Sequence, residues 1–191
     1  MTWMLTATGT TVDLRNPQAA TISTLDIAHS LALTNRFTGH TLRPYSVAEH
    51  SLLVEEIMSR EFGPMPPAAL LAALVHDAHE AYLGDISTPL KQALPSWALE
   101  DVESRLWMAV QHHFHTRAAS RDYASIIKRC DLMALAMERR DLLPPGGAPW
   151  PLLEGVEACT WVTLQQRAGM DWTDWRQAFI DRVASLLPQV D

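Results

Sequence analysis

Apolar residues recur at three- and four-residue steps through most of the chain, a period typical of helices. Ser46-Val47-Ala48-Glu49 has the form of a capping box, in which hydroxyl and carboxylate each satisfy a free amide at the start of a helix. Residues 68–75 are nearly all apolar, so their helix is expected to be buried on all sides and central. The predicted helices cover about residues 24–35, 46–62, 68–83, 96–114, 120–143 and 171–187.

The first fourteen residues depart from this pattern. Residues 3–6 and 10–14 flank Gly9 and predict a short hairpin, which Asn16-Pro17 ends. The clearest break follows residue 143, where Pro and Gly dominate residues 144–149 and predict a loop. The expected architecture is an all-α bundle of about six or seven helices with a short N-terminal hairpin. We expect one domain over residues 1–191, with its core at about 20–143 and a C-terminal helical extension at about 150–191.

Composition narrows the class of protein. The 191 residues carry a net charge of −7, which argues against nucleic-acid polymers and anionic membranes as partners, because these attract clustered basic residues. With 48% hydrophobic residues the chain can bury a core, yet its longest apolar run is far shorter than the ~20 residues that span a bilayer. No secretion signal opens the sequence, and two cysteines suit a reducing compartment, so a cytoplasmic location is expected.

The candidate chemistry is concentrated in one apolar helix. His76, Asp77, His79 and Glu80 lie within five residues of each other, directly after the apolar run. Burying such groups without partners is costly, and a divalent cation relieves the cost because carboxylates and imidazoles both bind it. Glu80 is four residues after His76 and three after Asp77, so it is expected to share their face of the helix.

Further ligands must come from other segments. His50 follows the predicted capping box, and Asp131 interrupts an apolar stripe on a later helix. The ordered set His50, His76-Asp77 and Asp131 resembles the H…HD…D signature of the HD superfamily of metal-dependent phosphohydrolases. Residues 36–40, 45–50 and 76–91 also resemble the bacterial and phage 5′-deoxynucleotidase-like branch, and the resemblance extends from about residue 13 to residue 143.

The resemblance implies a role for each matching residue. His50, His76, Asp77 and Asp131 would hold one divalent ion, for which Mn, Co, Fe, Ni or Zn suit the ligand types, with Mg as a further option. Glu80 matches the catalytic carboxylate, and Asp85 a second acidic group that orients water or nucleotide. Arg36 matches the basic residue that meets the phosphate. Phe37 stands where the characterised deoxynucleotidases have a Trp that stacks on the sugar.

These roles imply hydrolysis of (2′-deoxy)nucleoside 5′-monophosphates by attack of a metal-bound water. The alternative is a deoxynucleoside triphosphate triphosphohydrolase acting on a dATP-like substrate. Lys128, three residues before Asp131, could meet a further phosphate, or it could simply pair with its neighbours. A non-catalytic nucleotide-binding module is a third possibility. Relatives in the superfamily form dimers or larger rings, so a homo-oligomer is also implied.

Other conspicuous residues have structural interpretations. His79 is expected to make a core hydrogen bond, and Cys130 to be a buried small residue. The Trp97 and Trp107 side chains fit a helix interface, and His40 either lines the pocket or finishes a turn. A helix end rich in imidazole (His112, His113 and His115) lacks a carboxylate cluster and gives no support for a second metal. The segment Glu138-Arg139-Arg140-Asp141 is interpreted as a solvated helix end.

Overall fold

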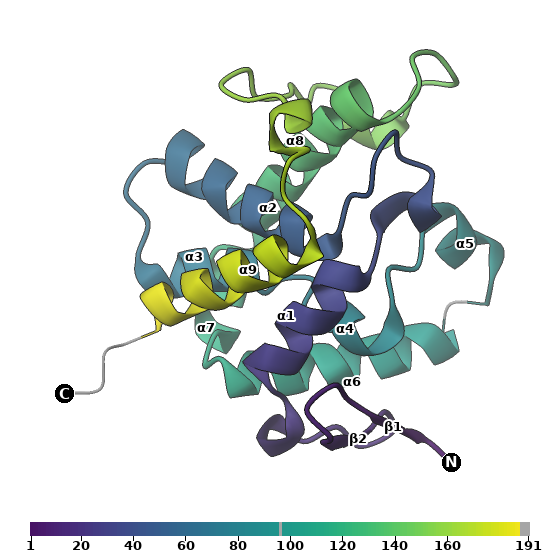
Figure 1. Ribbon diagram of the computed structural model, residues 1–191, viewed down its shortest axis with the longest axis vertical. Coiled ribbons are helices and arrows are strands. Elements are labelled where there is room, and N and C mark those ends of the chain that lie inside the picture. The colour runs from purple at the N-terminus through teal and green to yellow at the C-terminus, as the bar shows by residue number, and fades with distance from the viewer. Residues whose placement is uncertain (96, 188–191) are drawn as a thin grey trace.

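The computed structural model describes residues 1–95 and 97–187. In this part of the chain the only sheet is a two-stranded hairpin, and everything else that is regular is helical (Figure 1). The expected all-α class is therefore confirmed. The helices are α1 (Thr24–Leu33), α2 (Val47–Glu61), α3 (Pro67–Leu74), α4 (Glu80–Leu83), α5 (Thr88–Ala93), α6 (Trp97–His113), α7 (Arg117–Asp122), α8 (Ala124–Leu142) and α9 (Trp172–Leu186).

The N-terminal hairpin forms as predicted. Its strands β1 (Trp3–Leu5) and β2 (Thr11–Asp13) pair antiparallel, with Met4 opposite the buried Val12. The turn is fixed to α1 because Asp26 accepts hydrogen bonds from the backbone amide and the hydroxyl of Thr8, both at 2.8 Å. This ties the hairpin to the bundle at the lower end of the view in Figure 1.

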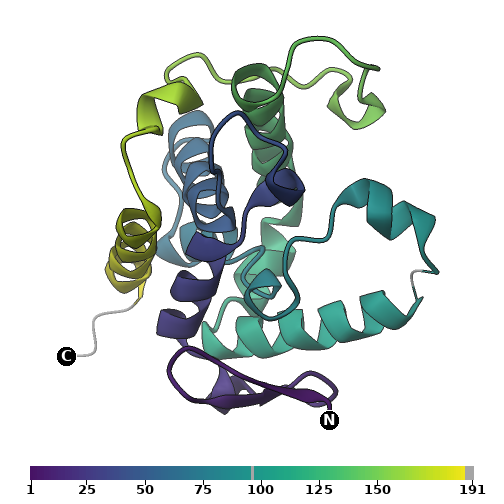
Figure 2. The same cartoon turned by 45° about the vertical axis from the view of Figure 1, so that its right-hand side comes forward.

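Helix α2 lies at the centre of the bundle. It packs against α1, α3, α8 and α9, and it runs beside α8 while α6 crosses below (Figure 2). Its buried face includes Leu53, Val54, Ile57 and Met58, which join one hydrophobic core with the apolar residues of α3. Because α2 carries His50 and the neighbouring α8 carries Asp131, two of the expected metal ligands lie on helices that pack against each other.

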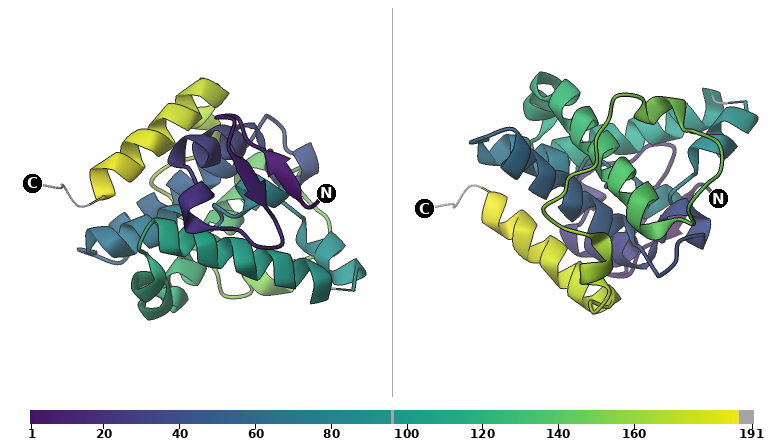
Figure 3. Two further views of the ribbon diagram at one scale, coloured as in Figure 1. Left: turned by 90° about the horizontal axis from the view of Figure 1, so that it is seen from below. Right: turned by 90° about the horizontal axis from the view of Figure 1, so that it is seen from above.

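The C-terminal helix covers one side of this core. Asp171 caps α9 by accepting hydrogen bonds from the amides of Thr173 and Asp174, so the helix begins where the sequence predicts. Phe179 and Val183 of α9 are buried in the same core, and α9 packs along α1 (Figure 3). Across residues 1–95 and 97–187, each helix is too short or too polar to span a bilayer.

The single helix predicted for residues 68–83 is wrong in one respect. It ends as α3 at Leu74, passes through a turn and resumes as α4 at Glu80. The carbonyl of Ala73, which would accept from Asp77 in a continuous α-helix, accepts instead from the amide and from the Nδ1 of His76. The imidazole thus competes with the helix for this carbonyl and breaks it at the candidate site.

Two short helices were not predicted separately. The segment expected to be a loop before residue 96 contains α5, and the helix expected from residue 120 divides at Tyr123 into α7 and α8. Together with the break after α3, these divisions give nine helices in the described residues in place of the six or seven expected. The additional helix α5 and the two divisions leave the all-α class unchanged.

The predicted cap of α2 is half formed. The Ser46 hydroxyl accepts from the Glu49 amide at 3.1 Å, but the Glu49 carboxylate forms a bidentate pair with Arg43 at 2.7 and 2.8 Å. Arg43 also donates to the carbonyl of Leu164, so the start of α2 is bonded to the C-terminal segment. The first turn of α2 is thereby fixed immediately before His50.

Removing the cap should have a modest, local effect. We expect Ser46→Ala to lower the free energy of unfolding by about 1 kcal/mol, because the Glu49 amide loses its acceptor in a buried turn. Urea unfolding measures this loss. The control is Ser59→Ala on the exposed face of the same helix, for which a change within about 0.5 kcal/mol is expected. Equal losses in the two variants would contradict the capping role.

Candidate metal centre

His50 lies in the first turns of α2, fully buried, with its two ring nitrogens facing different partners. Nδ1 donates to the Glu138 carboxylate at 2.6 Å. Nε2 is buried without a hydrogen-bond partner among the described residues. Because a buried nitrogen without a partner costs free energy, its direction indicates a missing ligand or ion.

His76 has the same arrangement. Its Nδ1 donates to the Ala73 carbonyl at 2.8 Å, which leaves Nε2 as the ring nitrogen turned away from the backbone. This Nε2 is also buried and unpartnered within the described chain. The turn that ends α3 therefore orients His76 as a metal-binding histidine is normally oriented, with a carbonyl holding the opposite nitrogen.

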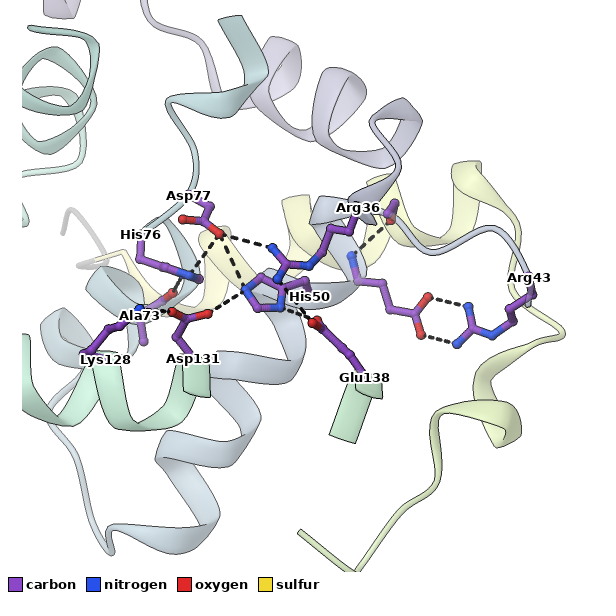
Figure 4. A network of polar contacts seen from close by, with 11 residues as sticks. Arg36, Arg43, His50, Ala73, His76, Asp77, Lys128, Asp131 and Glu138 are labelled. Atoms are coloured by element: carbon purple, nitrogen blue, oxygen red, sulfur yellow. Dashed lines mark hydrogen bonds and ion pairs between the residues drawn. The ribbon is translucent and has the colours of Figure 1, made fainter. Parts of the chain in front are cut away.

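The His50 imidazole faces the carboxylates of both Asp77 and Asp131, and the His76 imidazole faces Asp77 (Figure 4). The Asp77 Oδ2 lies 3.1 Å from His76 Nε2 and 3.5 Å from His50 Nε2, and Asp131 Oδ1 lies 3.4 Å from His50 Nε2. One ligand atom each from His50, His76 and Asp131 falls within 4.8 Å of the others. The four expected ligands are therefore brought together from α2, the turn after α3, and α8.

These separations fit the coordination shell of one ion. Ligands at about 2.1 Å from a metal are about 3.0–3.4 Å from each other in octahedral or tetrahedral geometry. The three nitrogen–oxygen separations are close to these values, and His50, His76 and Asp131 each offer a donor atom within 4.8 Å of the others, so these groups form a donor set for a divalent cation. The residues present thus fit the metal that the sequence pattern predicted.

Burial and neighbouring charges shift the pKa values of the candidate ligands in opposite directions. Burial and the Arg36 cation lower the pKa of His50, but Glu138 and Asp131 outweigh them and raise it to about 9. Burial favours the neutral forms of Asp77 and Asp131, yet the neighbouring imidazoles hold the pKa of both carboxyls below the usual range. The carboxylates are therefore ionised and ready to bind a cation near neutral pH.

Glu138 corrects a prediction from the sequence. The segment 138–141 was interpreted as a solvated helix end, but the Glu138 side chain is 0% exposed. It bonds to His50, and it pairs with Arg36 at 3.2 Å. Burial raises the pKa of Glu138, while Arg36 and His50 together bring it below the usual range. Glu138 is thus the buried anion that holds His50 in place, two helical turns beyond Asp131, the last residue of the recognised motif.

Arg36 lies against the centre, as expected, but it is already paired. Its guanidinium contacts Glu138 at 3.2 Å and Asp77 at 3.7 Å. Arg36 lies in the loop that leads into α2. An isolated bridge between Asn35 and Ser46 closes this loop onto the start of the helix. Arg36 therefore balances the acidic groups of the site.

Phe37 lies beside Arg36 in an unusual backbone conformation. Phe37 and Thr38 have φ values of 55° and 54°, the left-handed region that L-residues rarely adopt. The Phe37 ring centroid is 5.6 Å from the Arg36 guanidinium carbon and 6.3 Å from the Trp150 ring. The loop before α2 thus places an aromatic ring next to the basic group.

Glu80 and Asp85 are two further carboxyl groups, each close enough to Asp77 to interact with it electrostatically. Burial, followed by Asp77 and Asp85, raises the pKa of Glu80 to about 9. Burial also raises the pKa of Asp85, with Arg36 opposing it. Glu80 Oε2 is buried and has no partner among the described side chains. Glu80 is thus a carboxyl group near the ligands that makes no structural bond through this oxygen, as a proton-transfer group requires.

Lys128 is bonded to a candidate ligand. Its Nζ donates to Asp131 Oδ2 at 2.8 Å, while the other Asp131 oxygen faces His50. The side chain is 66% exposed and lines the cavity next to the centre. Both interpretations left open by the sequence therefore have a physical basis, because the same ammonium pairs with Asp131 and remains accessible.

The structure also places the cysteine and the histidines that were not assigned to the metal centre. Burial raises the pKa of the Cys130 thiol to about 12, which suits a packed residue and not a nucleophile. Burial lowers the pKa of His79, whose Nδ1 has no hydrogen-bond partner in the described structure, so the expected core bond is not made there. His40 is exposed, and His113 donates to the Ala19 carbonyl at 3.2 Å.

Two residues beside the centre have no counterpart in the sequence motifs. Trp107 and Gln111 of α6 line the cavity that His76, Asp77 and Asp131 border. Trp107 was expected at a helix interface, yet its side chain is 40% exposed. The spacing of four residues places both on one face of α6, but nothing in the sequence indicates that this face turns to the metal centre.

The fold and the site define a helical protein in which His50, His76 and Asp131 could together hold a metal ion, with Asp77 beside the two histidines. No model of a protein family matches the chain. The chain is 38% identical over 133 residues to the uncharacterized protein YfdR of Escherichia coli K12, a match that covers 70% of this chain and 68% of that protein. It belongs to the same family as that protein.

A second relative comes from another bacterium. The chain is 43% identical over 114 residues to the uncharacterized protein RCAP_rcc00048 of Rhodobacter capsulatus. That match covers 59% of this chain and 58% of the relative. Neither name gives an activity, so the function is argued from the site.

Proposed function

We propose that the protein is a metal-dependent phosphohydrolase of the HD superfamily, acting on (2′-deoxy)nucleoside 5′-monophosphates. The observation that carries this proposal is the convergence of His50, His76, Asp77 and Asp131, each from the position that the H…HD…D pattern requires. Nitrogen and carboxylate donors in equal number suit Mn, Co, Fe, Ni or Zn. A bound divalent ion would polarise a phosphoryl oxygen and lower the pKa of water.

The chain's own residues supply the remaining functions. Glu80 lies beside the ligands with one free carboxyl oxygen and takes the proton of the attacking water. Asp85, close enough to interact with Arg36 and Asp77, orients water or the nucleotide. Arg36 faces the transferred phosphate and balances its charge. Both cysteines are buried free thiols, in keeping with a protein of the cytoplasm.

A triphosphohydrolase is the second candidate. It is favoured by Lys128, whose ammonium is accessible and lies next to Asp131 at the edge of the cavity. A longer polyphosphate held by the metal could reach this charge. The same metal centre would then cleave at the α-phosphate and release tripolyphosphate.

A substrate panel tests the proposal. Nucleoside mono-, di- and triphosphates are incubated with Mn²⁺, Co²⁺, Zn²⁺ and Mg²⁺ in turn, and the products are separated. Release of inorganic phosphate from dAMP is the expected result. Release of tripolyphosphate from dATP without turnover of dAMP would establish the second candidate. No turnover of any ester with any of these metals would overturn the proposal and favour a non-catalytic nucleotide-binding module.

A further inference from the structure

A cavity of about 300 Å³ opens directly beside the metal centre. Its lining includes His76, Asp77 and Asp131 of the centre and Trp107 and Gln111 of α6. Its volume is at the lower end of the range for small-molecule sites. A phosphate held at the metal centre would direct the rest of its molecule into this space.

Trp107 gives the cavity a flat aromatic wall. Its indole is 40% exposed, although a side chain of this size is normally covered in a folded protein. Aromatic side chains that line cavities stack on flat rings, and nucleobases stack well because each has a π-face. The wall therefore suits a planar group attached to the phosphate through a short linker.

Gln111 adds a polar group one helical turn away on the same face. The residue is 4% exposed, and its Nε2 has no hydrogen-bond partner among the described residues. A buried amide without a partner is costly unless a ligand completes it. The side-chain amide carries a donor and an acceptor in one plane, which matches the edge of a nucleobase.

From these observations we infer that the cavity is a nucleobase subsite, in which Trp107 stacks on the base and Gln111 Nε2 donates a hydrogen bond to its edge. This inference rests on the proposed function, since the metal centre is taken to hold the phosphate. It names residues outside the motif as the source of selectivity for nucleotides over other phosphate esters. The base must carry an acceptor nitrogen or oxygen that can reach Gln111.

The first test compares a nucleotide with the same sugar phosphate lacking a base. The measured quantity is the ratio of kcat/KM for dAMP to that for 2-deoxyribose 5-phosphate, with Mn²⁺ present. We expect Trp107→Ala to lower this ratio by roughly tenfold and Trp107→Phe by much less, because phenylalanine still stacks. Gln111→Leu, which keeps the volume, should also lower the ratio.

Trp97→Ala is the matched control. Trp97 is on the same helix, is 76% exposed and does not line the cavity, so its removal should leave the ratio unchanged. An unchanged ratio in both Trp107→Ala and Gln111→Leu would overturn the inference. An equal fall in Trp97→Ala would also overturn it, because the effect would then come from the helix in general.

A binding measurement separates this inference from the proposed function. Calorimetry of the Mn²⁺-loaded protein with dAMP and with 2-deoxyribose 5-phosphate needs no turnover. Stronger binding of dAMP that falls roughly tenfold in Trp107→Ala supports the subsite even if no ester is hydrolysed. Equal binding of the two compounds by the wild-type protein would overturn the subsite, while hydrolysis of both at equal rates would leave the proposed function standing.

Discussion

Glu80→Gln should lower kcat for nucleotide hydrolysis by roughly 10²–10⁴-fold, which is the usual contribution of a positioned proton-transfer group. The amide keeps the shape of the side chain but cannot accept the proton of the attacking water. Glu80 is buried beside Asp77, where burial and acidic neighbours raise its pKa to about 9. A cation held by the neighbouring ligands would lower this pKa and favour the ionised base.

The metal content must be measured in the same samples. The proposal assigns Glu80 to proton transfer and not to the coordination shell, so Glu80→Gln should bind as much metal as the wild-type protein. Glu100→Gln, an exposed carboxylate on α6, is the control and should retain full activity. Wild-type turnover by Glu80→Gln would remove Glu80 from the reaction, and loss of the metal would reassign it to the coordination shell.

Glu138→Gln should weaken metal binding by about 10–100-fold, although Glu138 does not face the ion. The Glu138 carboxylate is fully buried and fixes His50 through Nδ1 at 2.6 Å, which directs Nε2 at the two aspartates. An amide can still accept this hydrogen bond, but it removes the charge that raises the basicity of the imidazole. Metal titration by calorimetry measures the effect, with the exposed Glu154→Gln as control.

Removing the whole Glu138 carboxyl group should also lower the stability of the fold. Glu138→Ala leaves the buried Arg36 without its 3.2 Å partner, and breaking a buried ion pair in this way costs about 3–5 kcal/mol of stability. Urea unfolding of the metal-free protein measures this loss separately from metal binding. If neither Glu138 variant changed metal affinity, Glu138 would serve only to neutralise Arg36.

The periodicity of apolar residues was sufficient to predict the fold class, the hairpin and the final helix. It could not predict the break after Leu74, because Ala73 and its neighbours favour a continuous helix by composition. At the break the His76 amide and imidazole both take the Ala73 carbonyl. The apolar pattern does not report this side-chain contact, which competes with the helical hydrogen bond.

For the candidate site, the sequence was sufficient to predict the metal ligands but not the residues that surround them. The four ligands could be named because residue types and order are specific, and the structure brings them together. Glu138 was missed because a charged residue in the sequence Glu-Arg-Arg-Asp resembles a solvated surface until its helix face is known. Its position seven residues after Asp131, two turns along α8, is the signal that could have revealed it. Trp107 and Gln111 were out of reach, since only the crossing of α6 brings them to the metal centre.

The most direct test of the metal centre is its stoichiometry. The protein is stripped with a chelator, reloaded with Mn²⁺ or Co²⁺, freed of excess ion and measured by elemental analysis. About one ion per chain is expected for the wild-type protein, and far less for His50→Ala, His76→Ala, Asp77→Ala and Asp131→Ala, each checked for folding by circular dichroism. No retained ion in the folded wild-type protein, or an equal amount in all four variants, would contradict a metal centre built from these residues.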